Sequence, residues 1–186
     1  KFKEFLHFNS MLQGHTEICT PGVEYSGGSL GQGISFACGL AYSAKLKKKD
    51  YKVFCIIGDG ESHEGEVWEA AMFGSHYKLD NLYVVVDYNH YCTLGNVDEI
   101  MNLKPLEDKW KSFGWETIFE EDGNNIEHMI NNFKKLESID GKPKCIIANT
   151  QKNKGVPSWE KEHIHHVAGE KLFDGVKEGR KILKDE

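Results

Sequence analysis

Three short apolar runs, each rich in β-branched residues, constrain the fold more than any other feature of this sequence. They occupy residues 53–57, 82–86 and 145–148. Continuous apolar runs of this length are typical of strands that are buried on both faces, as in parallel sheets. We therefore predict three buried parallel strands, and residues 115–119 are a candidate for a further strand.

Stretches with the apolar spacing of helices separate these predicted strands. They cover residues 34–46, 66–77, 106–113 and 126–136, and a terminal helix is predicted over residues 170–183. Strands that alternate with helices build βαβ units. The pattern predicts an α/β fold, a three-layer open sheet that is mainly parallel, with helices on both faces. Residues 149–169 show no clear period and are expected to form a long loop.

Length and charge limit the organisation of the chain and its partners. At 186 residues, one domain over residues 1–186 is expected. The formal charge of −6 argues against a protein that binds nucleic acid, which would need clustered Lys and Arg. No apolar stretch approaches the ~20 residues of a membrane span. The five cysteines contain no C-x-x-C pair, which indicates neither a disulfide framework nor a zinc site and favours a cytoplasmic protein.

Polar residues follow two of the predicted strands. Gly58, Asp59 and Gly60 come directly after the first, and Asn89 follows the second, 30 residues beyond Asp59. The carboxyl ends of parallel strands share one edge of a sheet, where ligands bind. Mg²⁺ prefers oxygen ligands and is often shared with phosphates, which flanking glycines allow to approach closely. Gly-Asp-Gly alone is also a common turn, but together with Asn89 it predicts a metal and diphosphate site.

The region around Asp59 resembles the thiamine diphosphate (ThDP) motif of the transketolase family. The resemblance is carried by residues 58–71, by residues 78–82 and by the Asp87-Tyr88-Asn89 sequence. It implies that Asp59 and Asn89 bind a divalent metal, Mg²⁺ or Ca²⁺ or Mn²⁺ in its place, together with the backbone carbonyl of Tyr91. It also implies contacts with the cofactor, and the residues that would make them here include Gly58, Gly60, Glu61 and Asn89.

A second block, over residues 14–17, 21–24 and 28–33, strengthens the resemblance. It implies that His15 contacts the sugar substrate and that Gly28 and Leu30 lie against the cofactor. Glu64 and Glu69 match family glutamates that link two active sites across a subunit interface. A solvated helix face is the other interpretation of both residues. His15 and Glu64 are our candidates for catalytic roles.

The histidine-rich segment at residues 162–166 lies close to where the family has a histidine that touches the diphosphate. We assign this contact to His165, and His163 and His166 remain alternatives because the register can shift by a residue. An exposed polar loop or a zinc site would also account for such a cluster. His90, next to Asn89, is predicted to lie on a loop surface.

Two features depart from the family pattern. Residues 92–95 read Cys-Thr-Leu-Gly where the family commonly has an Ile-Asp-Gly ending, which predicts a different thiazolium side of the pocket. The chain also starts downstream of two histidine-containing motifs. We therefore interpret residues 1–186 as a diphosphate-binding domain that lacks the amino-terminal part of the family domain, either as a fragment or as a naturally shortened relative.

The order of the blocks is closest to that of transketolases split into two polypeptides. It implies a transferase that moves a two-carbon ketol unit between phosphorylated or nucleotide-linked sugars, using ThDP and Mg²⁺. The partner would be the carboxyl-terminal subunit with the pyrimidine-binding domain, in an α2β2 heterotetramer. The alternatives are 1-deoxyxylulose-phosphate synthase, a 2-oxoacid dehydrogenase E1 component, or a catalytically silent subunit that scaffolds a partner.

Overall fold

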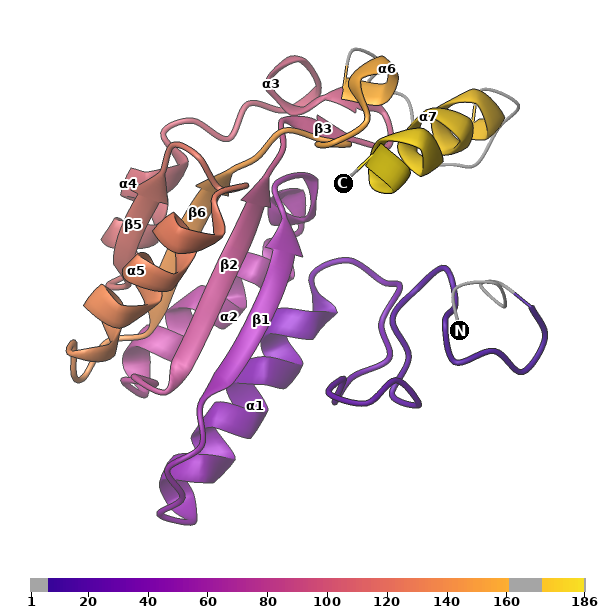
Figure 1. The fold of residues 1–186 in the computed structure, drawn as a ribbon. Helices are drawn as coiled ribbons and strands as arrows, with labels where there is room; N and C mark the ends of the chain where they lie inside the picture. The colour runs from indigo at the N-terminus through magenta and orange to yellow at the C-terminus, as the bar shows by residue number, and fades with distance from the viewer. Residues whose placement is uncertain (1–6, 161–171, 186) are drawn as a thin grey trace.

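Four parallel strands form the central sheet of the computed structural model, which describes residues 7–160 and 172–185 (Figure 1). They are β1 (Val53–Gly58), β2 (Leu82–Tyr88), β5 (Glu116–Glu120) and β6 (Lys144–Asn149). Their order across the sheet is β1-β2-β6-β5, and every neighbouring pair is parallel. The predicted strands and the predicted parallel sheet are confirmed.

Helices cover both faces of this sheet, as predicted. The larger core joins the sheet to α1 (Gln32–Leu46), α2 (Gly65–His76) and α4 (Leu106–Ser112). The smaller core joins the other face to α5 (Ile126–Glu137) through Leu136, Tyr83 and Ile146. Successive strand residues point to opposite faces, so Ile146 belongs to the smaller core and Ile147 to the larger one.

The remaining elements are mostly too short for periodicity to predict. They are the 3-10 helix η2 (Gly60–His63), the hairpin of β3 (Tyr91–Cys92) and β4 (Gly95–Asn96), α3 (Val97–Ile100) and α6 (Pro157–Glu160). Helix α6 lies within the predicted loop. Helix α7 (Leu172–Asp185) confirms the predicted terminal helix. In Figure 1, α6 and α7 lie at the end of the molecule where the strands β1 and β2 finish.

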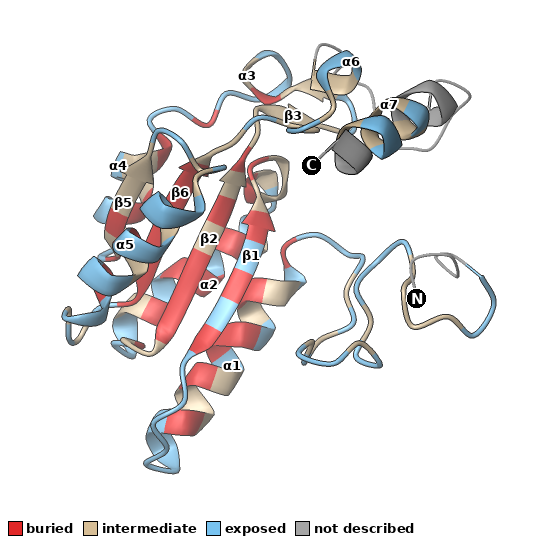
Figure 2. Ribbon diagram, viewed as in Figure 1, coloured by how far each residue is buried: buried red, intermediate tan, exposed pale blue. Residues whose placement is uncertain are grey.

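Strand β1 departs from the prediction that it is buried on both faces. Val53 and Ile57 are buried, whereas Phe54 is 59% and Ile56 76% exposed, and the alternation is visible in Figure 2. The physical reason is position, since β1 is an edge strand of the described sheet. Helix α5 packs against β5 and reaches Phe54 through the ring of Phe133.

The thiols and helices agree with two further expectations. All five cysteines lie in the described residues and are free thiols. Burial raises the pKa of the Cys38 and Cys55 thiols to about 12, so both stay protonated and pack as small apolar groups. None of the described helices is both long and apolar enough to cross a bilayer.

Candidate metal and diphosphate site

Asp59 lies where β1 ends and η2 begins, and its side chain is only 1% exposed. Its Oδ1 accepts a hydrogen bond from the backbone N–H of Gly60 (2.7 Å) and its Oδ2 accepts one from the backbone N–H of His90 (2.6 Å). Burial raises the pKa of the Asp59 carboxyl, although these two donors act to lower it. Asp59 takes part in none of the ion pairs formed within the described residues. A buried carboxylate of this kind fits a site for a divalent cation, whose charge would compensate the cost of burial.

Asn89 follows β2 in an orientation that its hydrogen bonds fix. Its Nδ2 donates to Oδ2 of Asp87 (2.9 Å), and its Oδ1 accepts from the backbone N–H of Tyr91 (3.1 Å). A carboxylate can only accept, so the amide nitrogen must face Asp87. The hydroxyl of Thr150 donates to the other Asp87 oxygen and holds it in place. Since a carbonyl oxygen has two lone pairs, Oδ1 of Asn89 keeps one for a metal ion.

The bond from His90 to Asp59 joins the loop after β2 to the end of β1. The structure therefore brings Asp59 and residues 89–91 together at the sheet edge where the sequence predicted them. No group of three or more His, Cys, Asp or Glu that could hold a metal occurs in the part of the chain that the structure describes. A metal at this edge would thus depend on the amide oxygen of Asn89 and the carbonyl of Tyr91, and their role as ligands stays a prediction.

Glu61 connects the two glycine-rich segments that were predicted to contact the cofactor. Its Oε1 accepts from the backbone N–H of Gly31 (2.9 Å) and its Oε2 from that of Gly58 (3.1 Å). Gly31 has φ +85°, and a Cβ there would lie 2.9 Å from Cβ of Glu64, so only glycine fits. Glu61 thus aligns Gly58 with the segment that contains Leu30, and its own contact with the cofactor stays a prediction.

Gly60 provides a further test, because a Cβ at this position would lie 2.6 Å from Cβ of Cys92. We expect Gly60→Ala to displace the β3–β4 hairpin and with it the carbonyl of Tyr91. The affinity for ThDP in the presence of Mg²⁺ should fall about tenfold, the scale of a disturbed metal shell. Gly39→Ala, in α1 with nothing within 4 Å of the added Cβ, is the matched control and should bind normally. Equal affinities in calorimetry for the two variants would contradict this role of Gly60.

His15 and Gly28 meet in the structure, although 13 positions separate them in the sequence. A Cβ on Gly28 would lie 3.3 Å from the imidazole of His15. Both residues are exposed, and Leu30 is 55% exposed. Leu30 directly precedes Gly31, whose N–H binds Glu61. The second block therefore reaches the Asp59 loop at its Gly31 end, and His15, Gly28 and Leu30 present an exposed surface.

Glu64, Glu69 and the histidine-rich segment are less well determined. Glu64 is the N-cap residue of α2, and its side chain makes no capping hydrogen bond. Glu64 and Glu69 are both exposed, which agrees equally with a subunit interface and with a solvated helix face. His165, like its alternatives His163 and His166, lies outside the described residues.

Several residues of this edge escaped the sequence interpretation. His90 was predicted to lie on a loop surface, but it is half-buried, and its Nε2 lies 2.8 Å from Oδ1 of Asn149. His90 thus lies in a loop as predicted, but its imidazole faces the end of β6. Lys152 is also half-buried; desolvation lowers its pKa, while the charges of Asp87 and Asp59 raise it. Asn149 and Lys152 come at or just after the end of a predicted strand, the signal that identified Asn89.

Comparisons with known proteins agree with this geometry. Residues 1–184 match the family model described as transketolase, thiamine diphosphate binding domain. The chain is 40% identical over 174 residues to one of the subunits of apulose-4-phosphate transketolase from Phocaeicola vulgatus, a match that covers 92% of this chain and 62% of that protein. It is also 40% identical over 158 residues to 6-deoxy-6-sulfo-D-fructose transketolase subunit SqwG of a Clostridium species, covering 84% of this chain and 57% of that protein.

A solved structure of a transketolase also resembles this chain. Transketolase from Campylobacter jejuni superposes with a TM-score of 0.86 at 31% identity, over 96% of this chain and 29% of that one. The chain therefore spans about three fifths of the length of the two subunits it resembles and less than a third of the Campylobacter jejuni chain.

Proposed function

This chain belongs to the transketolase family as a thiamine diphosphate-binding domain, and from that premise we propose that it holds the diphosphate end of ThDP in an enzyme that transfers two-carbon ketol units. The observation that carries the proposal is the hydrogen bond of 2.6 Å between the N–H of His90 and Asp59. This bond brings the oxygen atoms of Asp59, at the end of β1, close to those of residues 89–91, after β2. Ligands of open α/β sheets bind at these carboxyl ends of the strands.

Each residue of the site has a proposed task. The oxygens of Asp59, Asn89 and Tyr91 would hold Mg²⁺, or Ca²⁺ or Mn²⁺ in its place, and Gly58 and Gly60 would let the diphosphate approach the backbone. The cation Lys152 would offset part of the diphosphate charge. When bound, ThDP supplies the carbanion chemistry, and the protein binds and orients the reactants.

The substrate and the assembly are also proposals. The names of the two subunit relatives specify a sugar phosphate and a sulfosugar. The first supports a phosphorylated sugar as the substrate here, and a nucleotide-linked sugar stays the alternative. The same names describe subunits, which supports a partner subunit for this chain. We propose that the partner carries the pyrimidine-binding domain and that the two chains form an α2β2 heterotetramer. Glu64 and Glu69 are exposed and would then face the interface. We treat residues 1–186 as one diphosphate-binding domain, and its five free cysteines support a cytoplasmic location.

His15 is proposed to contact the sugar. We expect His15→Ala to lower kcat/KM for the donor sugar about a hundredfold, as for loss of a positioned polar contact, while the affinity for ThDP changes less than twofold. Steady-state kinetics and calorimetry on the assembled enzyme measure the two effects separately. His7→Ala, an exposed histidine of the same segment, is the control. A loss confined to ThDP affinity would show that His15 serves the cofactor.

The reaction type can be tested directly with the chain and its partner together. We expect transfer of two carbons from a ketose phosphate to an aldose phosphate, measured by mass spectrometry of the products. Release of CO₂ from pyruvate would instead indicate 1-deoxyxylulose-phosphate synthase or a 2-oxoacid dehydrogenase E1 component. Normal ThDP binding without turnover of any of these substrates would favour the catalytically silent scaffold.

A further inference from the structure

We propose that His90 and Asn149 are positioning residues, whose side-chain hydrogen bond holds the loop after β2 in the geometry that binds the metal. The inference rests on the proposed function, because the site it concerns is the proposed metal and diphosphate site. It adds a requirement at two residues that are not themselves proposed as ligands, and it links the ends of all four strands of the sheet.

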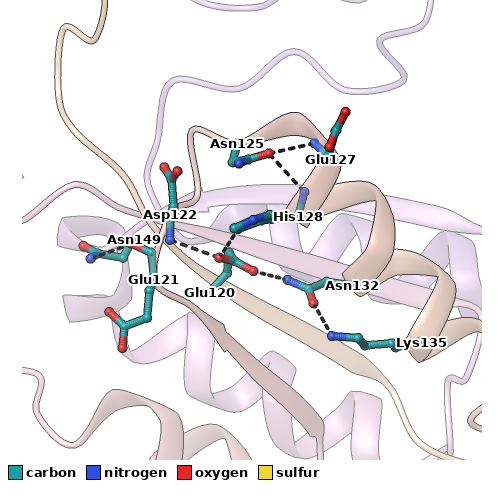
Figure 3. A network of polar contacts seen from close by, with 9 residues as sticks. All are labelled: Glu120, Glu121, Asp122, Asn125, Glu127, His128, Asn132, Lys135 and Asn149. Atoms are coloured by element: carbon teal, nitrogen blue, oxygen red, sulfur yellow. Dashed lines mark hydrogen bonds and ion pairs between the residues drawn. The ribbon is translucent and has the colours of Figure 1, made fainter.

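The bond between the two side chains has a defined direction. Asn149 ends β6, and its Nδ2 donates to the backbone carbonyl of Glu121 at 3.2 Å (Figure 3). A carbonyl can only accept, so the amide nitrogen must face Glu121 and Oδ1 must face His90. His90 Nε2 lies 2.8 Å from this Oδ1 and must therefore carry a proton.

The backbone of His90 shows why this bond is needed. Its φ of 68° lies in the left-handed region, which costs free energy for a residue other than glycine. The side chain secures this conformation through Asn149 and through the ring of Tyr88, whose centroid lies 4.2 Å from that of the imidazole. In this conformation the N–H of His90 points at Oδ2 of Asp59, and the two neighbours of His90 are the proposed ligands Asn89 and Tyr91.

Asn149 is itself held by the hydrogen-bonded turn between β5 and α5. The backbone N–H of Gly123 donates to the carbonyl of Asn149 (2.8 Å). In Figure 3 the carboxylate of Glu120 accepts from three donors: the N–H of Asp122 (3.0 Å), Nδ1 of His128 (3.0 Å) and Nδ2 of Asn132 (2.7 Å). The hydrogen bonds on the two sides of this turn are joined by the backbone of residues 120–123, which links α5 to Asn149 and, through the bonds of His90, to Asp59. Partners of this kind orient metal ligands before the metal arrives.

The test compares the Mg²⁺ concentration at which ThDP binding is half-saturated in matched variants. Binding is monitored by tryptophan fluorescence on the chain together with its partner. His90→Leu removes the donor, whereas His90→Gln keeps an N–H near the position of Nε2 at the same backbone cost. We expect the Leu variant to need about five- to tenfold more Mg²⁺, because it loses the hydrogen bond to Asn149. Asn149→Ala should need at least as much, because it also loses the hydrogen bond to the carbonyl of Glu121. The Gln variant should stay within about twofold of the wild type, and the double variant should be no worse than Asn149→Ala alone.

Two further results separate this role from a purely structural one. His90→Gly adopts a positive φ without strain, so it should fold normally, and its Mg²⁺ requirement should lie between those of the wild type and the Leu variant, because it loses the bond and the backbone strain together. Equal Mg²⁺ requirements for the Leu and Gln variants would overturn the proposal. Additive effects of His90→Leu and Asn149→Ala would overturn it as well. A wild type that binds no ThDP at any Mg²⁺ concentration would instead refute the proposed function.

Discussion

Asp59→Ala is expected to weaken Mg²⁺-dependent binding of ThDP by at least about a hundredfold while the protein stays folded. Even a lost partner of a metal ligand costs about ten- to a hundredfold in metal affinity, and the loss of a ligand should cost more. The fold should persist because the substitution removes a buried carboxylate whose pKa burial has raised, which relieves a desolvation cost. Calorimetry would measure the affinity, and circular dichroism the fold.

Asn89→Ala should have an effect of the same kind, because it removes the second proposed side-chain ligand. Asp50→Ala is the matched control, since Asp50 is an exposed carboxylate in the loop before β1 and should leave binding unchanged. If Asp59→Ala and Asn89→Ala both bound ThDP with the affinity of the wild type, the assignment of the metal site would be wrong.

The second large effect concerns the partner. We expect this chain alone to show no ketol transfer, and activity to appear only when a polypeptide with the pyrimidine-binding domain is added. In this proposal the chain holds the diphosphate, while the groups that activate the aminopyrimidine end of the cofactor come from the other subunit. The hydrogen bonds of the candidate site gather around Asp59 and Asn89, which are proposed to hold the metal and the diphosphate.

The measurement is the rate of product formation at a fixed concentration of this chain and increasing concentrations of partner. The rate should rise from background and saturate near one partner per chain. The Asp59→Ala variant mixed with the same partner is the control and should stay at background. Multiple turnovers by this chain alone, at a rate that no partner alters, would contradict the proposal.

Periodicity predicted the main elements well, because the core of this domain follows the periods of helices and parallel strands. The end of β1 located Asp59, and the end of β2 located Asn89, from the order of residues alone. The exposed face of β1 could not be predicted, since periodicity does not show which strand lies at the edge of the sheet.

The contacts that orient the site also lie beyond what the sequence shows. His90 and Asn149 are 59 positions apart, and their bond depends on the β2–β6 pairing, which sets Tyr88 opposite Asn149. The positive φ of His90 likewise depends on its surroundings, because histidine does not require it. Residue type and spacing therefore indicated the candidate ligands, whereas the residues that hold them required the three-dimensional structure.

The central claim is that this domain binds the diphosphate of the cofactor through a divalent metal at the carboxyl ends of β1 and β2. Calorimetric titration of the chain with its partner tests this most directly, with ThDP or thiamine monophosphate as the ligand and with Mg²⁺ or EDTA in the buffer. We predict tight binding of ThDP in Mg²⁺ and at least about a hundredfold weaker binding when either the metal or the second phosphate is missing. Equal affinity for ThDP in Mg²⁺ and in EDTA would contradict the account.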